Sequence, residues 1–178
     1  VVWVCCAPFS ILAQQQEETV PSIYLMKDGL PTEGVNCARQ DSLGFIWLGT
    51  YSGLVKFDGY RYTNYRNNPE SSNSLSSNLV HSLVEDGMGR LWIGHSNGVD
   101  LFDPRTEKFY LHWPDSGDHK NAFTARLRKR KDGRIWICTY NGVYVADPKT
   151  LNIEKFSQHS SHTYDIAETS DGSVVTAS

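Results

Sequence analysis

The chain has 178 residues, of which 39% are hydrophobic and 21% are charged, a composition typical of a globular domain and not of a disordered segment. The formal net charge of −3 is too small to predict nucleic acid or an anionic membrane as a partner. The sequence begins at Val1 and stops inside a repeat, so we expect it to be a piece of a longer protein.

Residues 1–13 are apolar and are followed abruptly by "QQQEET". This segment is shorter than the about 20 residues that span a bilayer. It fits the apolar region of a secretory signal peptide, with Ala13 as the small residue before the cut, and a buried strand is the alternative. We interpret residues 1–13 as the remnant of a signal peptide and residues 14–178 as the N-terminal fragment of an exported, periplasmic domain.

An isolated strand is predicted at residues 22–27, "SIYLMK". After it, "GLPTEGVNCARQD" runs in register with "SLSSNLVHSLVED", 45 residues later. One longer phrase then recurs, as "GFIWLGTYSGLVKFDG" at 44–59, "GRLWIGHSNGVDLFDP" at 89–104 and "GRIWICTYNGVYVADP" at 133–148. A partial copy, "GSVVTAS", begins at Gly172, and Trp47, Trp92 and Trp136 mark the register of the full copies.

Each repeat is predicted to hold four short strands. The first carries apolar residues three apart, such as Val35 and Ala38. A turn at "DSLG", "DGMG", "KDG" or "SDG" leads to the second strand, and we expect the turn of the third copy to be one residue tighter. The turn before the third strand holds Gly53, Gly98 or Gly142, and Asn-Gly there predicts a type I′ turn with positive φ at both central residues. The fourth strand is rich in aromatic residues, as in "KFYLHW".

This pattern predicts β-propeller blades. A β-sandwich is the competing fold, but it gives no reason to repeat a Trp at fixed intervals. The predicted fold class is all-β: a partial β-propeller with about three and a half four-stranded antiparallel blades of a larger ring. The blade repeats lie near residues 34–65, 79–113, 123–158 and 163–178. The missing blades are expected beyond Ser178, and residues 22–27 are expected to be the orphan outer strand that completes the last blade.

The repeated tryptophans and glycines are interpreted as structural. An indole ring buries about 200 Å² and can fill the wedge between adjacent blades, so we favour a core role for these rings over stacking on a ligand. Cys37 and Cys138 lie on different repeats and show neither a metal spacing nor a disulfide framework, which predicts two free buried thiols.

The unit "DSLGFIWLGTYSGLVKFDGYRYTNY", preceded by "KDGLPTEGV", closely resembles the two-component regulator propeller repeat. The resemblance covers residues 22–178. Its hallmarks in the first copy are Asp41 and Gly44, the run Trp47-Leu48-Gly49-Thr50, Gly53-Leu54, and Phe57-Asp58. The second copy departs from the pattern by His95 for Thr, and the third by Cys138 for Gly.

The resemblance implies the periplasmic sensor region of a hybrid two-component histidine kinase anchored in the inner membrane. It implies a soluble ligand of the oligosaccharide class, a homodimeric full-length receptor, and contacts with the remaining blades and downstream domains of the same chain. It implies no nucleic-acid partner for this segment. Other members of the repeat family drive diguanylate cyclases. A secreted propeller enzyme or carbohydrate-binding protein without a kinase is the alternative.

The run "RLRKRK", residues 126–131, replaces the near-neutral or acidic stretches "CARQDS" and "SLVEDG" of the sister repeats. On a strand, Arg126, Arg128 and Arg130 share one face, where bidentate contacts could hold an acidic sugar or another carboxylate ligand. The alternative is a solvated strand end that offsets nearby acids. A second candidate for sugar binding is a set of turn residues expected to be exposed, namely Tyr51, His95 and Tyr140.

No catalytic residue, metal or cofactor is predicted in this segment. The six histidines show no ligand spacing beyond the pair His159 and His162. The aspartates repeat with the turns, so we expect them to hydrogen-bond the turn backbones; they are Asp41, Asp58, Asp86, Asp103, Asp132 and Asp147.

Overall fold

A computed structural model describes residues 30, 34–114, 122–156 and 162–178 of the chain. These residues form fourteen strands and no helix. The predicted signal peptide at residues 1–13 and the predicted orphan strand at residues 22–27 lie outside the described residues, as does His159.

The strands form three four-stranded antiparallel sheets and one two-stranded sheet. The first blade contains β1 (Val35–Gln40), β2 (Ile46–Thr50), β3 (Gly53–Phe57) and β4 (Tyr62–Tyr65). The second contains β5 (Val80–Glu85), β6 (Leu91–His95), β7 (Gly98–Asp103) and β8 (Lys108–Trp113). The third contains β9 (Thr124–Lys129), β10 (Ile135–Thr139), β11 (Gly142–Ala146) and β12 (Ile153–Lys155), and the partial fourth contains β13 (Asp165–Glu168) and β14 (Val174–Ala177). The predicted all-β fold of about three and a half blades is confirmed.

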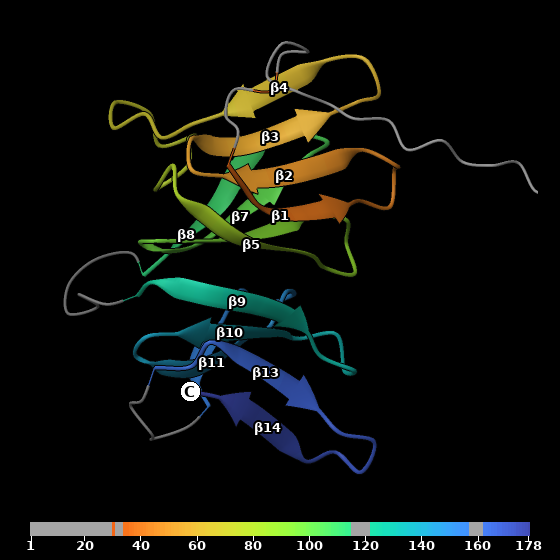
Figure 1. The fold of residues 1–178 in the computed structure, drawn as a ribbon, viewed down its shortest axis with the longest axis vertical. Helices are drawn as coiled ribbons and strands as arrows, with labels where there is room; N and C mark the ends of the chain where they lie inside the picture. Colours follow the sequence, from red (N-terminus) through yellow and green to blue (C-terminus); the bar gives the residue numbers. More distant parts are fainter. Residues whose placement is uncertain (1–29, 31–33, 115–121, 157–161) are drawn as a thin grey trace, which may run out of the picture.

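The blades follow one another along an arc, with the first strand of each blade next to the first strand of its neighbour (Figure 1). β1 contacts β5, β5 contacts β9, and β9 contacts β13. These four strands therefore form the inner wall of the arc. A single residue bulges out of the first three of them, at Asn36, His81 and Ala125, which explains why their apolar residues are spaced by three rather than two.

Three apolar clusters fill the spaces between successive blades, and each contains one repeated tryptophan. Trp47 packs with Phe102 of the second blade, Trp92 with Tyr144 of the third, and Trp136 with Ile166 of the fourth. The exposed fractions of the three tryptophans are 0%, 0% and 1%. The core role predicted for these rings is confirmed, because each blade buries its face only against its neighbour.

The turn before the second strand binds the tryptophan of its own blade. Asp41 accepts hydrogen bonds from the Leu43 and Phe45 amides and, at 2.7 Å, from Nε1 of Trp47. Asp86 does the same for Nε1 of Trp92 at 3.1 Å. The predicted role of these aspartates in holding turn backbones is thereby confirmed.

The third copy of this turn is not one residue tighter. Gly133 N donates to Arg130 O and Arg130 N to Arg134 O, the same pattern that Asp41, Gly44 and Phe45 make in the first copy. Arg130 therefore occupies the aspartate position. Without that carboxylate, Nε1 of Trp136 donates instead to Glu168 Oε1 of the fourth blade, at 2.9 Å.

The hairpin turn between the second and third strands is also not the predicted type I′ turn. Its two central residues are Tyr51 and Ser52 in the first blade, since Thr50 pairs with Gly53, and neither has positive φ. The glycine comes one position later, with φ of 123° at Gly53. It is needed there for space too, because an added Cβ would lie 2.3 Å from the Tyr65 carbonyl oxygen.

The two cysteines of the described part are free. Cys138 is buried as predicted, and Cys37 is only partly buried. Burial raises the pKa of the Cys37 thiol to about 11 and that of Cys138 to about 12, so both thiols are protonated at neutral pH.

Candidate functional site

The inner wall of the arc holds a hollow of about 310 Å³, which lies at the lower end of the range of small-molecule sites. Strands β1, β5 and β9 contribute its lining. Four cationic side chains border it, and none of its lining residues is acidic; the four are Arg39, Arg126, Arg128 and Lys129. This wall is therefore a positively charged concave surface.

The structure separates the three arginines that the sequence places on one face. Arg128 donates from Nε and Nη2 to the two carboxylate oxygens of Asp165, both at 2.6 Å. Arg126 is more loosely placed, with Nε 4.0 Å from Asp165 Oδ2. β9 ends at Lys129, and Arg130 lies over the ring of Trp136 with its Nε 3.2 Å from Glu168 Oε1. Arg126 and Arg128 therefore face the hollow, while Arg130 joins the third blade to the fourth.

Arg39 is a residue that the sequence analysis missed. It lies on β1, is exposed, and borders the same hollow as Arg126 from two blades away. Within the described residues it makes no ion pair. The only signal in the sequence is a lone arginine at the end of an inner strand, which is not distinctive.

Aromatic side chains lie at the end of the blades where the inner strands begin. Tyr140 stacks on Phe123 with ring centroids 4.4 Å apart, and it meets the edge of Tyr164 at 5.8 Å. Tyr164 has an exposed fraction of 51%, and Tyr51 of the first blade has 61%. Tyr51 is therefore exposed as predicted, whereas Tyr140 is partly covered by its aromatic neighbours.

His95 is not an exposed turn residue, so its predicted place among the sugar-stacking side chains is wrong. Its exposed fraction is 0%. It occupies the position that Thr50 and Thr139 hold in the first and third blades. The Oγ1 atom of each threonine accepts a hydrogen bond from the backbone amide of the second central residue of its hairpin turn. His95 Nδ1 accepts the equivalent bond from Asn97 N at 3.2 Å, and this geometry directs the ring inward.

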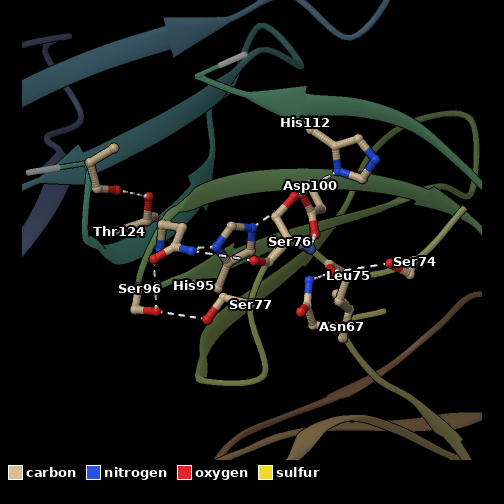
Figure 2. Close-up of polar contacts among 12 residues, drawn as sticks. Asn67, Ser74, Leu75, Ser76, Ser77, His95, Ser96, Asp100, His112 and Thr124 are labelled. Atoms are coloured by element: carbon tan, nitrogen blue, oxygen red, sulfur yellow. Dashed lines mark hydrogen bonds and ion pairs between the residues drawn. The ribbon is translucent and has the colours of Figure 1, made fainter. Parts of the chain in front are cut away.

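The buried ring of His95 reaches a polar cluster centred on Asp100 (Figure 2). Asp100 has an exposed fraction of 0%, and its Oδ1 lies 2.7 Å from His112 Nδ1 and 3.2 Å from His95 Nε2. Ser76 donates to the same carboxylate from its amide at 2.8 Å and from its hydroxyl at 2.7 Å. The cluster thus satisfies a buried charge with three hydrogen bonds and with the nearby ring of His95.

The Asp100 cluster holds the segment that connects the first two blades in place. Ser76 belongs to the segment between β4 and β5, and Asn67 closes that segment with a 2.6 Å hydrogen bond from Nδ2 to the Leu75 carbonyl. Leu75 is fully buried in the cluster between the two blades. Asp100 therefore holds a long connection in the one conformation that inserts Leu75 into the core.

The Ser76, His112 and Asp100 side chains do not have the geometry of a catalytic triad. In a triad the acid and the serine contact opposite nitrogens of the imidazole. Here Ser76 Oγ and Asp100 Oδ1 lie 2.8 and 2.7 Å from the same Nδ1 of His112. His112 Nε2 faces the Ser72 carbonyl oxygen at 3.1 Å, so the acid and the serine do not contact opposite nitrogens of the ring.

The pKa values in the cluster move in opposite directions. Burial alone raises the pKa of Asp100, but the hydrogen bonds from His112, His95 and the Ser76 amide outweigh it and hold that pKa well below its ordinary value. The hydrogen bond to Asp100 raises the pKa of His112. Both ring nitrogens of His112 face hydrogen-bond acceptors. Only the doubly protonated imidazolium has an N–H donor for each of them.

We expect His112 to make the protein less stable as the pH rises. The pKa of His112 is higher in the folded state than in the unfolded state, so protonation of His112 stabilises the fold. This stabilisation is complete at pH values below the unfolded-state pKa of 6.5, and it is lost as the pH rises through the higher folded-state pKa. Urea unfolding on both sides of pH 6.5 should show this loss, and His112→Gln should abolish it. His81, whose pKa is lowered by burial, has the opposite slope in both proteins, so the difference between wild type and variant isolates His112. An unchanged slope in the variant would contradict the assignment.

Among the described residues, no group of three or more His, Cys, Asp and Glu side chains is arranged to hold a metal ion. The same residues include no helix with the length and apolar character needed to cross a bilayer.

Comparison with known protein families identifies the repeat. Residues 29–52 and 74–97 match the family described as two component regulator propeller. These two segments are similar to two-component regulator propeller repeats. The two matched segments each run from the residues before an inner strand to the hairpin turn after the tryptophan strand.

The chain spans only part of the length of the proteins that it matches. Over 72 residues, or 38% of its length, the chain is 43% identical to histidine kinase P4 of Formosa agariphila, and it covers 5% of that protein. Its fold is similar to that of the extracellular domain of a hybrid two-component system from B. thetaiotaomicron, with a TM-score of 0.76 and 23% identity over 87% of this chain and 23% of that one. Virginiamycin B lyase from Staphylococcus aureus shares the fold at a TM-score of 0.61 and 17% identity, over 83% of this chain and 50% of that one. Likeness at such identities shows the propeller fold and not a shared activity.

Proposed function

We propose that this chain is the N-terminal, ligand-sensing part of a periplasmic propeller that belongs to a hybrid two-component histidine kinase. The observation that carries this proposal is the pair of two-component regulator propeller repeats at residues 29–52 and 74–97. The 43% identity to a histidine kinase over 72 residues supports the same assignment. In this proposal the remaining blades, a membrane anchor and a kinase follow in the full protein, which acts as a homodimer.

The proposed ligand is a soluble glycan fragment. The supporting features are a concave inner wall with Arg126, which suits the oxygen atoms of a polar ligand, and aromatic rings at the end of the blades. Arg128 borders the same wall, but its guanidinium is paired with Asp165. Tyr51 and Tyr140 keep their place as candidate stacking residues. His95 is withdrawn because it is buried, and Arg130 is withdrawn because Trp136 and Glu168 occupy its guanidinium.

In this proposal the chain binds a ligand and does not catalyse a reaction. The cluster of Ser76, His112 and the buried Asp100 has a structural role. For binding to produce a signal, the ligand must favour one of two arrangements of the receptor dimer, by about 1–3 kcal/mol for typical coupled sites. A stiff propeller suits this task because a ligand on its surface changes how the whole rigid body packs against its neighbours.

We expect the intact sensor region to bind at least one soluble oligosaccharide in calorimetry against a panel of neutral and acidic glycan fragments. The same purified protein is expected to leave every polysaccharide of the panel intact. Release of reducing ends would favour the alternative, a secreted propeller enzyme. Absence of binding to every sugar would remove the glycan assignment, and a reading frame without a kinase would remove the sensor assignment.

A further inference from the structure

We propose that the hollow in the inner wall binds the carboxylate of an acidic sugar between Arg39 on β1 and Arg126 on β9. This inference rests on the proposed function and narrows the ligand to a glycan that carries a uronate. It also assigns Arg39, which lies 87 residues before Arg126 in the sequence, to the ligand site.

The first argument is the placement of the two arginines. Both are exposed, and both border the hollow of about 310 Å³ from opposite sides of β5. The guanidinium group presents its donors in a planar fork that matches the two oxygens of a carboxylate. A carboxylate in the hollow can therefore be held by two blades at once.

The second argument is the charge that the protein leaves uncompensated. Asp165 is the acidic residue that Arg126 and Arg128 approach, and its two oxygens are taken by Arg128 at 2.6 Å each. It lies 4.0 Å from Nε of Arg126 and is absent from the lining of the hollow. Arg39 has no ion pair within the described residues. The guanidinium group of Arg39 is thus available to an anion from outside, and that of Arg126 is only loosely paired.

The third argument is a small apolar patch in a hollow that is otherwise mostly polar. Ala38 and Leu83 also border the hollow and are not fully buried. They offer a surface for the C–H groups of a sugar ring, while the ring hydroxyls remain in water. The combination of a cationic pair and a small apolar patch fits a sugar acid better than a bare inorganic anion, which has no apolar face to place there.

The position of Asp165 also leads to a prediction about the affinity of the site for an acidic sugar. Its carboxylate occupies the fork of Arg128 in the same bidentate manner that a ligand carboxylate would adopt. Removing it with Asp165→Asn frees a third guanidinium group beside the hollow and raises the local positive charge. This variant is therefore expected to bind an acidic sugar more tightly, the opposite of the effect expected for the arginine variants.

The test is calorimetric titration of the intact sensor region with glucuronate oligosaccharides, with the matched neutral glucose oligosaccharides, and with acetate as a carboxylate without a sugar. The expected result is preference for the glucuronate ligands, weakened by added salt. Arg39→Gln and Arg126→Gln are each expected to lower that affinity at least about tenfold, the loss expected for a charge-assisted contact. Asp165→Asn is expected to increase it.

Arg61→Gln is the matched control, because Arg61 is an exposed arginine of the β3–β4 turn outside the hollow. It is expected to bind like wild type, and thermal unfolding of every variant confirms that the fold is kept. Equal binding of glucuronate and glucose ligands, or equal effects of Arg39→Gln and Arg61→Gln, overturns the carboxylate site and leaves the proposed function intact. Binding of acetate as tight as glucuronate overturns the sugar-acid assignment, and binding of no sugar at all overturns both proposals.

Discussion

Replacing Trp92 by Ala is expected to lower the free energy of unfolding of the intact propeller by about 3–5 kcal/mol, the usual range for removing a large buried aromatic side chain. Trp92 is fully buried in the cluster between the second and third blades. Its loss removes contacts from both blades, and it also leaves Asp86 without the hydrogen bond from the indole. The neighbouring strands cannot collapse into the space, because their backbones are fixed by the ladders of two different sheets.

Chemical denaturation of wild type and variant measures this effect. Tyr60→Ala is the control, since Tyr60 is 93% exposed and its truncation removes an aromatic ring without making a cavity. The control should unfold at the wild-type midpoint. A Trp92→Ala midpoint equal to that of the control would show that the ring does not join the blades.

The second large effect is expected at Asp100. Asp100→Ala should destabilise the protein by about 3–5 kcal/mol, as is typical when one partner of a buried charged network is removed. The change leaves His95 Nε2, His112 Nδ1 and two donors of Ser76 without their shared acceptor. It should also release the segment between β4 and β5, because that carboxylate holds Ser76 in place.

Hydrogen exchange distinguishes this local release from a general loss of stability. In Asp100→Ala the amides of residues 66–79 should exchange faster than those of the third blade. Asp58→Ala is the control, because Asp58 is an exposed turn aspartate that accepts only from its own turn, at Tyr60 and Arg61. Uniform acceleration across all blades in Asp100→Ala would argue against the fastening role.

The blade pattern is readable in the sequence because each repeat solves the same burial problem. A tryptophan is needed wherever two blades meet, and a glycine is needed wherever an outer strand approaches the hairpin, as at Gly53 and Gly98. Both requirements recur at a constant spacing. The finer turn geometry is not readable, because an Asn-Gly pair is compatible with a turn centred one residue earlier, at Ser96 and Asn97.

The site residues were harder to predict, because their environment is set by neighbouring blades. The turn position of His95 predicts exposure, but the residue occupies the same repeat position as Thr50, and both are buried. Arg39 was overlooked because Asp41 follows it closely and makes the stretch look neutral. In the folded chain Asp41 is engaged with the turn and with Trp47, which leaves the charge of Arg39 uncompensated.

The junction after the third blade has a consequence for how such rings evolve. The last residue before the turn differs among the copies, as Gln40, Glu85, Lys129 and Glu168. Glu85 and Glu168 each accept a hydrogen bond from the turn of the preceding blade. Glu168 receives Nε1 of Trp136 and the guanidinium of Arg130, so a duplicated blade with lysine in its place would set two cations against each other. The copies are therefore not interchangeable modules. The charges of neighbouring copies must be complementary, which limits which blade can follow which. Recombination within the array is restricted to exchanges that preserve this complementarity.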